Sequence, residues 1–251
     1  MRSELIEAIR SEQTARLLAI PVAVLLGSLA CSSSGPTAPG SRALTELPLT
    51  METEHFSLRY QEQDQGVIAD YATVLEANYD RIVNDFLMTE VPRVTARFYH
   101  DQQAFTAATG HANLGRTLSS SIFALVAQPL NLDGALHEFT HCVTLVFFKT
   151  SYYPSWLFES VALYEADQLV APSTVACLAN REFPSIPALG LGGSCSVYPV
   201  GYTIAEFIVE TWGRARLRAL ILSHGDVPGV LGVPWSDFQS GWEAFVTDRY
   251  L

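Results

Sequence analysis

The sequence predicts an α+β fold in which a small mixed β-sheet, with one helix packed on it, precedes a mainly helical half. Three segments between residues 55 and 127 have the hydrophobic patterns of strands, and a helix-periodic segment follows the first of them. From about residue 132 onwards the periodicity is almost entirely helical. Strands that are grouped ahead of helices, instead of alternating with them, are typical of α+β domains.

The first residues of the chain are predicted to lie outside this domain. Residues 17–30 form an apolar run that is too short to span a bilayer as a helix but has the length of a signal-peptide core. Cys31 follows, then a stretch rich in serine, glycine and proline, and this junction resembles that of a bacterial lipoprotein. We therefore expect residues 1–31 to be a signal peptide with Cys31 as its lipid-modified residue, and residues 32–51 to be a flexible linker. Because Ser28 stands where such junctions usually have leucine, simple secretion and an uncleaved anchor are the alternatives.

These features and the overall charge limit the partners of the protein. Export would place it in the periplasm or at the cell surface, with membrane contact only through a lipid anchor at Cys31. The net charge is −11 and lysine and arginine together number 15, which argues against nucleic-acid binding because phosphate contacts need those residues. The acidity favours solubility and does not identify a substrate. The pattern does not define an oligomeric state.

The sheet is predicted at the start of a domain that covers residues 52–251. Residues 55–60 alternate apolar and polar side chains, as a half-buried strand does, and residues 67–86 repeat apolar side chains at three and four, as a helix does. Residues 94–99 and 120–127 have the pattern of a second and a third strand. The helix of residues 67–86 can therefore lie on a sheet of these strands.

The helical half begins with an apolar stripe over residues 132–147, with Asn131 and Asp133 available as caps. A second helix is predicted from Pro154, because proline is favoured in the first turn. Residues 171–197 are rich in proline, glycine and serine and predict a long ordered loop. Further helices are predicted over residues 202–211, 214–223 and 235–250.

The segment His137-Glu138-Phe139-Thr140-His141 lies on the first of these helices and has the pattern of a zinc site. Helix positions four apart share one face, so His137 and His141 can bind one metal ion. Glu138 lies beside that face, where a carboxylate can act as a general base on metal-bound water without being a ligand. Catalytic Zn²⁺ usually has three protein ligands, and Glu159 would complete a set of two histidines and one carboxylate.

Chain length permits Glu159 to reach this site. A helix that ends near residue 147 continues about 10 Å past His141, at about 1.5 Å per residue. Residues 149–153, if extended, span up to roughly 16 Å at about 3.3 Å per residue. The chain can therefore return, and one turn of the helix that begins at Pro154 brings Glu159 to the two histidines.

These residues, together with Trp156-Leu157 before Glu159 and Ala162 and Tyr164 after it, resemble the gluzincin metallopeptidases, most closely their small peptidase MA-like members. The resemblance implies a zincin-like domain that hydrolyses peptide bonds of a peptide or protein by metal-activated water. It also implies that the substrate is held in extended form along the third strand, residues 120–127. Those sequences usually have glycine after the third ligand, where this chain has Ser160. The Gly-x-Met-x-Asn motif of related aminopeptidases is absent, which favours an endopeptidase or a processing enzyme.

The same resemblance implies a donor for the oxyanion that forms during hydrolysis. Tyr198-Pro199-Val200-Gly201 is similar to the Tyr-x-x-Gly segment that supplies the transition-state tyrosine in gluzincin aminopeptidases. Tyr198 is therefore the predicted donor, because a phenol donates a hydrogen bond without a charge that would repel zinc. Tyr202, one turn on, is the alternative, and an ordinary packing role for Tyr198 is also open.

The remaining cysteines and histidines are predicted to be structural. Cys177 and Cys195 flank the loop of residues 171–197, and in an exported protein such a pair is usually a disulfide. Cys142 lies within the metal-binding helix and is predicted to be a small buried apolar residue. The other histidines, which lack a ligand-like spacing, are His55, His100, His111 and His224.

A second class of protein fits the same pattern. A non-catalytic exported zinc-binding or assembly protein could retain the peptidase fold, and Ser160 in place of glycine supports that alternative. Glu138 argues against it, because a site that only binds metal needs no base.

Overall fold

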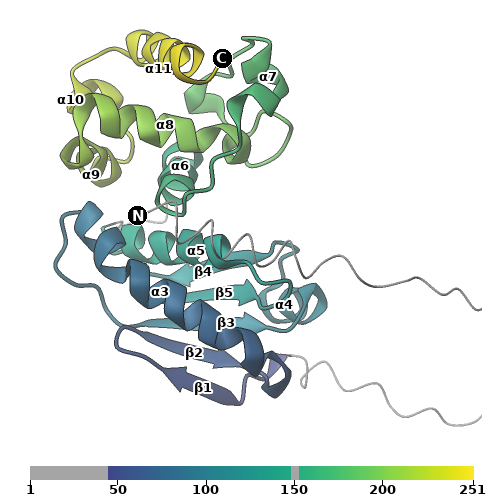
Figure 1. Cartoon of the computed structure of the whole chain (residues 1–251). Coiled ribbons are helices and arrows are strands. Elements are labelled where there is room, and N and C mark those ends of the chain that lie inside the picture. The colour runs from purple at the N-terminus through teal and green to yellow at the C-terminus, as the bar shows by residue number, and fades with distance from the viewer. Residues whose placement is uncertain (1–44, 148–152) are drawn as a thin grey trace, which may run out of the picture. The chain divides into compact units, whose positions relative to one another are not determined.

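A computed structural model describes residues 45–147 and 153–251 and has the predicted α+β architecture (Figure 1). A mixed sheet with a helix on it is followed by a mainly helical half. The predicted signal peptide, the lipid-modification site at Cys31 and most of the predicted linker lie outside the described residues. Within the part of the chain that is described, no helix is both long and apolar enough to cross a bilayer.

The sheet has five strands in the order β1-β2-β3-β5-β4. Its two inner pairs are parallel and its two outer pairs antiparallel. The strands are β1 (Leu49–Glu52), β2 (Phe56–Tyr60), β3 (Val94–Tyr99), β4 (Gly115–Ser119) and β5 (Ile122–Val126). The three predicted strands are confirmed as β2, β3 and β5, whereas β1 and β4 were not predicted. Strand β1 begins at Leu49, within the segment of residues 32–51 that was predicted to be a linker, and ends at Glu52, the first residue of the predicted domain.

One face of the sheet carries the main core of the protein, under α3 (Gln65–Asp85) and α5 (Leu132–Leu145). The buried strand residues of this core are Phe56, Leu58, Tyr60, Val94, Ala96, Phe98, Phe123 and Leu125. The other face has a small cluster around Phe105 of α4 (Gln102–Thr109). The sequence analysis missed α4, which has Asp101 as its N-cap and the left-handed Gly110 as its C-cap.

The helical half consists mainly of α6, α8, α9 and α11 (Figure 1). Of the predicted helices, the one assigned to residues 202–211 is longer than expected, because α8 begins at Val197. The predicted loop of residues 171–197 contains short helical turns and the predicted Cys177–Cys195 disulfide, which is confirmed. The bounds are α6 (Ser155–Glu165), α7 (Ala176–Ala179), α8 (Val197–Trp212), α9 (Arg214–Leu222), α10 (Val227–Leu231) and α11 (Trp235–Tyr250). The short helices α7 and α10 were not predicted.

A buried carboxylate fixes α6 to two other helices. Glu165, the last residue of α6, has a fully buried side chain whose two oxygens accept from Arg81 of α3 at 2.7 Å and Arg214 of α9 at 2.6 Å. Arg81 also donates to the backbone carbonyl of Glu165 at 2.8 Å, and Asp85 lies 2.9 Å from Arg214. This network holds the C-terminal end of α6 against α3, on the sheet side, and against α9.

Removal of this carboxylate should destabilise the whole domain. We expect Glu165→Ala to lower the free energy of unfolding by about 2–4 kcal/mol, because it leaves two partly buried guanidinium groups with Asp85 as their shared counterion. This loss of stability is smaller than the loss expected when a fully buried ion pair is broken, because the Arg81 and Arg214 side chains are 23% and 24% exposed. Urea denaturation would measure the change. Glu210→Ala, which breaks the exposed pair with Arg249, should cost under about 1 kcal/mol, and an equal loss in the two variants would contradict the prediction.

Candidate metal centre

The helix that carries the predicted ligands is positioned by its cap and by burial. The Asn131 side chain accepts a hydrogen bond from the backbone N–H of Gly134 at 3.0 Å, which starts α5 at the residue after Asn131. Gly134 fits there because a Cβ atom would lie 2.3 Å from the Asn131 side chain. Residues 134–144 are all buried. The polar groups of α5 are therefore held inside the protein, where they need partners.

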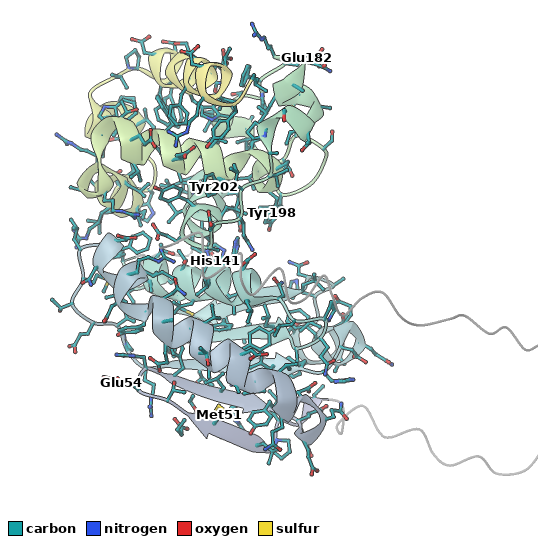
Figure 2. All side chains as sticks on the ribbon, in the orientation of Figure 1. Met51, Glu54, His141, Glu182, Tyr198 and Tyr202 are labelled. Atoms are coloured by element: carbon teal, nitrogen blue, oxygen red, sulfur yellow. A yellow bond between two sulfur atoms is a disulfide. The ribbon has the colours of Figure 1, made fainter. Side chains whose placement is uncertain are left out.

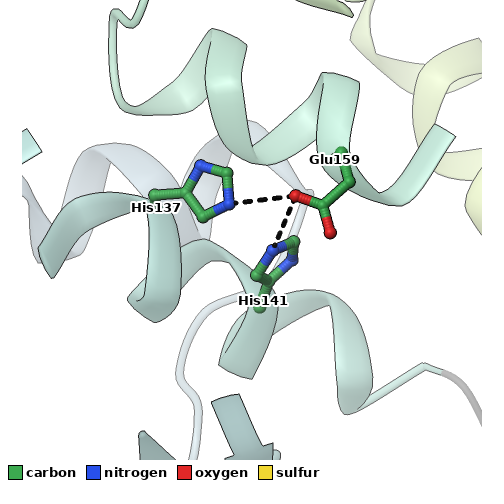
Figure 3. Close-up of side chains that lie close together, drawn as sticks. All are labelled: His137, His141 and Glu159. Atoms are coloured by element: carbon green, nitrogen blue, oxygen red, sulfur yellow. Dashed lines mark hydrogen bonds and ion pairs between the residues drawn. The ribbon is translucent and has the colours of Figure 1, made fainter. Parts of the chain in front are cut away.

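His137 and His141 meet Glu159 of α6, as the sequence predicted (Figure 3). Glu159 Oε2 lies 3.2 Å from His137 Nε2 and 3.6 Å from His141 Nε2, and one ligand atom from each residue lies within 4.8 Å of the others. The three residues are between 4% and 9% exposed. Two imidazole nitrogens and one carboxylate oxygen, converging at this spacing, can hold a metal ion. The connecting residues 148–152, on which the reach argument depended, lie outside the described residues.

The charges of these groups are strongly coupled. Burial alone would raise the pKa of Glu159, but hydrogen bonds from the two imidazoles outweigh it and hold that pKa well below its usual range. Burial likewise opposes protonation of His137, while its contact with Glu159 outweighs this and raises the pKa of His137. The carboxylate is thus ionised and faces groups that attract it. Such a site can accept a cation in place of the imidazole protons.

Each histidine ring also has a contact outside the ligand group: a hydrogen bond for His137 and a stacked aromatic ring for His141. Gln168 Oε1 lies 2.9 Å from His137 Nδ1, and a proton on Nδ1 leaves Nε2 with its lone pair facing the ligand group. The His141 ring stacks on Phe158 at 3.9 Å, and Phe158 stacks on Tyr153 at 4.1 Å. His141 Nδ1 is buried without a hydrogen-bond partner among residues 45–147 and 153–251. Sequence reasoning missed Gln168, since an acceptor for a metal-binding histidine can come from anywhere in the fold.

Glu138 lies next to the ligand group without belonging to it. It is 8% exposed, and its Oε2 accepts a hydrogen bond from the hydroxyl of Thr117, on β4, at 2.7 Å. Its Oε1 makes no hydrogen bond with any residue that the structure describes. The carboxylate therefore has one oxygen that is held and one that is available. Thr117 is a second site residue that the sequence analysis did not identify.

The serine that follows Glu159 packs between two helices. Ser160 is fully buried, and a Cβ atom added to Gly201 of α8 would lie 2.7 Å from its hydroxyl oxygen. Serine is larger than the glycine usual at this position, and its side chain faces Gly201 on the neighbouring helix. Because Gly201 has no side chain, the serine hydroxyl has space there. The departure from glycine at position 160 is accommodated by the contact between α6 and α8.

The two candidate tyrosines of α8 have different surroundings (Figure 2). Burial raises the pKa of Tyr198, and the nearby charges of Glu159 and Glu138 raise it further. The Tyr202 hydroxyl instead donates to Asp167 at 3.5 Å. Burial and the charges of Asp167 and Glu206 raise the pKa of Tyr202. Tyr198 is therefore the tyrosine that faces the predicted site.

The strand predicted to hold an extended substrate is not at an edge of the sheet. The segment of residues 120–127 contains β5, which pairs with β3 on one side and β4 on the other. Its backbone groups are already used, so the prediction that a substrate pairs with it was wrong. The edge strand on this side is β4, which carries Thr117.

The other predicted structural residues behave as expected. Cys142 is buried as a free thiol, with Sγ 3.4 Å from the carbonyl oxygen of Ser119. His55 and His100 lie beside carboxylates, His55 with Glu76 at 2.6 Å and His100 with Asp64 at 2.7 Å. His55 also lies 3.9 Å from Glu54, but among the described residues neither histidine belongs to a group that could hold a metal ion.

Comparisons with known proteins do not assign the chain to a family. No family model, curated protein or solved structure matches it. The likeness to gluzincins therefore rests on the residues of the motif, and a functional interpretation depends on the geometry of the site.

The ligand assignment predicts a change in metal content. Wild-type protein loaded with Zn²⁺ and dialysed should retain about one zinc per chain by elemental analysis. A variant that combines His137→Ala with Glu159→Ala should retain almost none, because one protein ligand is left. His111→Ala, at an exposed histidine, is the control and should retain the metal. Full occupancy in the double variant would show that the ion binds elsewhere.

Proposed function

We propose that the protein is an exported zinc-dependent peptidase of the gluzincin type. The observation that carries the proposal is the buried group of His137, His141 and Glu159 with the held carboxylate of Glu138 beside it. The donor set fits zinc, which when bound supplies a Lewis acid for the scissile carbonyl and a water of lowered pKa.

Glu138 acts as the general base in this proposal. Its Oε2 is held by Thr117, so Oε1 is the atom that takes the proton from the attacking water. The same oxygen can later pass that proton to the leaving amine. A purely metal-binding protein, the other class considered, does not require a second carboxylate fixed next to the ligands, so the Thr117 contact favours the peptidase.

Tyr198 supplies the hydrogen bond to the oxyanion. A tyrosine phenol keeps its proton at neutral pH and can therefore donate a hydrogen bond. The effect of the Glu159 and Glu138 charges on the Tyr198 phenol supports this assignment, whereas the Tyr202 hydroxyl contacts Asp167. A neutral donor aimed at the position where negative charge develops stabilises the transition state.

An extended peptide is proposed to pair with the free edge of β4. No strand among residues 45–147 and 153–251 pairs with this edge, and β4 packs against α5 through the contact between Thr117 and Glu138. Main-chain pairing would hold the substrate backbone with little dependence on sequence. It would also place the scissile bond near Glu138.

Export of the protein remains part of the proposal. The Cys177–Cys195 disulfide supports an oxidising compartment, because such bonds rarely persist in the cytosol. A bacterial membrane or the periplasm is the proposed location, with Cys31 as the point of attachment.

The general-base assignment predicts a selective loss of activity. Glu138→Gln should lower the rate of peptide hydrolysis by about 10²–10⁴-fold, because the amide cannot accept the proton. Digestion of a peptide library by zinc-loaded protein would identify substrates and measure the rate. Zinc content should be unchanged, and Glu62→Gln, at an exposed glutamate, should retain full activity. If the Glu138→Gln protein cleaves as fast as the wild type, the general-base role of Glu138 is excluded.

The oxyanion assignment distinguishes the two tyrosines. Tyr198→Phe should lower kcat by about 10–1,000-fold, as the loss of one such donor does, with zinc content and melting temperature little changed. Tyr202→Phe is the matched control and should have nearly the wild-type kcat. The reverse pattern would transfer the role to Tyr202.

A further inference from the structure

Two residues of the edge strand β4 contact the Glu138 carboxylate. The Thr117 hydroxyl donates to Oε2 at 2.7 Å, and Gly115 lies so close that a Cβ atom there would be 2.6 Å from Oε1 and 3.0 Å from Cγ. Residues two apart on a strand point to the same face. The two residues therefore face different oxygens of the carboxylate. Gly115, which has no side chain, leaves room for Oε1, and Thr117 donates a hydrogen bond to Oε2.

The hydrogen bond from Thr117 opposes a competing arrangement of Glu138. A carboxylate on a flexible side chain next to a cation site is attracted to the cation and can become a further ligand. A ligand carboxylate would occupy the position that water needs and would lose its role as a base. An O–H···O⁻ bond of 2.7 Å is short and charge-assisted, and it keeps Oε2 directed towards β4.

The glycine at position 115 is needed for space and not for its backbone conformation, since its φ lies outside the left-handed range. A methyl group there would press on Glu138 from one side and on Leu125 Cδ1, 2.9 Å away, from the other. The strand has little freedom to retreat, because β4 pairs with β5 and Cys142 of α5 donates to the carbonyl oxygen of Ser119. Alanine at position 115 would therefore displace the carboxylate.

We propose that Thr117 and Gly115 are positioning residues that keep Glu138 as a base and prevent it from becoming a fourth metal ligand. This inference rests on the proposed peptidase function and adds to it a role for β4 that does not involve the ligands. The substrate is proposed to pair with the same strand. In this proposal β4 therefore positions both the substrate backbone and the Glu138 carboxylate relative to each other.

The holding contact can be tested without metal or substrate. In metal-free protein, urea denaturation of Thr117→Val, Glu138→Ala and the double variant forms a double-mutant cycle. We expect Thr117→Val to cost clearly less stability in the Glu138→Ala background than in the wild type, because the charged acceptor is gone and only the backbone carbonyl oxygen of residue 138, 3.0 Å from the hydroxyl, remains. Thr95→Val is the control, since the hydroxyl of this partly buried threonine on β3 makes no hydrogen bond with any described residue, and its loss should be the same in both backgrounds. Additive losses for Thr117 and Glu138 would overturn the inference whatever the activity.

The catalytic part is tested by kinetics of zinc-loaded protein. Thr117→Val should lower kcat by about 10–100-fold through displacement of Glu138, with KM and zinc content little changed. Thr117→Ser keeps the hydroxyl and should restore most of kcat, which a general loss of packing would not explain. Gly115→Ala should also lower kcat, whereas Gly66→Ala, where a Cβ atom meets nothing within 4 Å, should not.

The outcomes separate this inference from the proposed function. A wild-type kcat in Thr117→Val, alongside an inactive Glu138→Gln, would overturn the positioning role and leave the peptidase intact. A wild-type protein that binds zinc but cleaves no peptide would overturn the proposed function and the catalytic part of this inference together. The double-mutant cycle would in that case still decide whether Thr117 holds Glu138.

Discussion

The position of α6 depends on the buried carboxylate of Glu165. An ionised group without water is stable only when its charge and its lone pairs are matched, and Arg81 and Arg214 provide both. Because one arginine comes from α3 and the other from α9, the requirement to satisfy one charge fixes three helices relative to one another. Glu159 lies on the same helix and therefore reaches the histidines of α5 through tertiary contacts that are distant from the site itself.

The site concentrates polar groups that a core built only for stability would avoid. His137, Glu138, His141 and Glu159 are all buried or nearly so, and His141 Nδ1 and the Ser160 hydroxyl are buried without partners in the described part of the chain. Each such group costs free energy. The apolar core around them, with Phe139 and Val161 fully buried, offsets that cost. Local conflicts of this kind are expected where a structure is adapted to a function.

The sequence predicted the elements whose burial follows a simple period, and it missed those whose role depends on the rest of the fold. Strands β2 and β3 and helix α3 are buried on one face, so their apolar residues repeat at two or at three and four. The metal motif was predictable because the helical period places its histidines together. Strand β4 has mixed burial and no alternation, and Gly115 matters only because Glu138 is opposite it. Nothing in a linear pattern indicates Gln168 or Thr117, which reach the site from distant segments.

The edge strand β4 shows why these missed residues matter most for the proposed chemistry. An exposed strand edge invites pairing with another chain, and proteins usually shorten or distort such edges. This strand is short, with an irregular register between Thr117 and Ser119, and no other strand in the described part of the chain pairs with its outer edge. Its Thr117 side chain holds Glu138, so a peptide that pairs with the outer edge would be aligned by the same strand that holds the proposed base. A shift of β4 would then move substrate and base together, which preserves their relative geometry in a way that two separate elements could not.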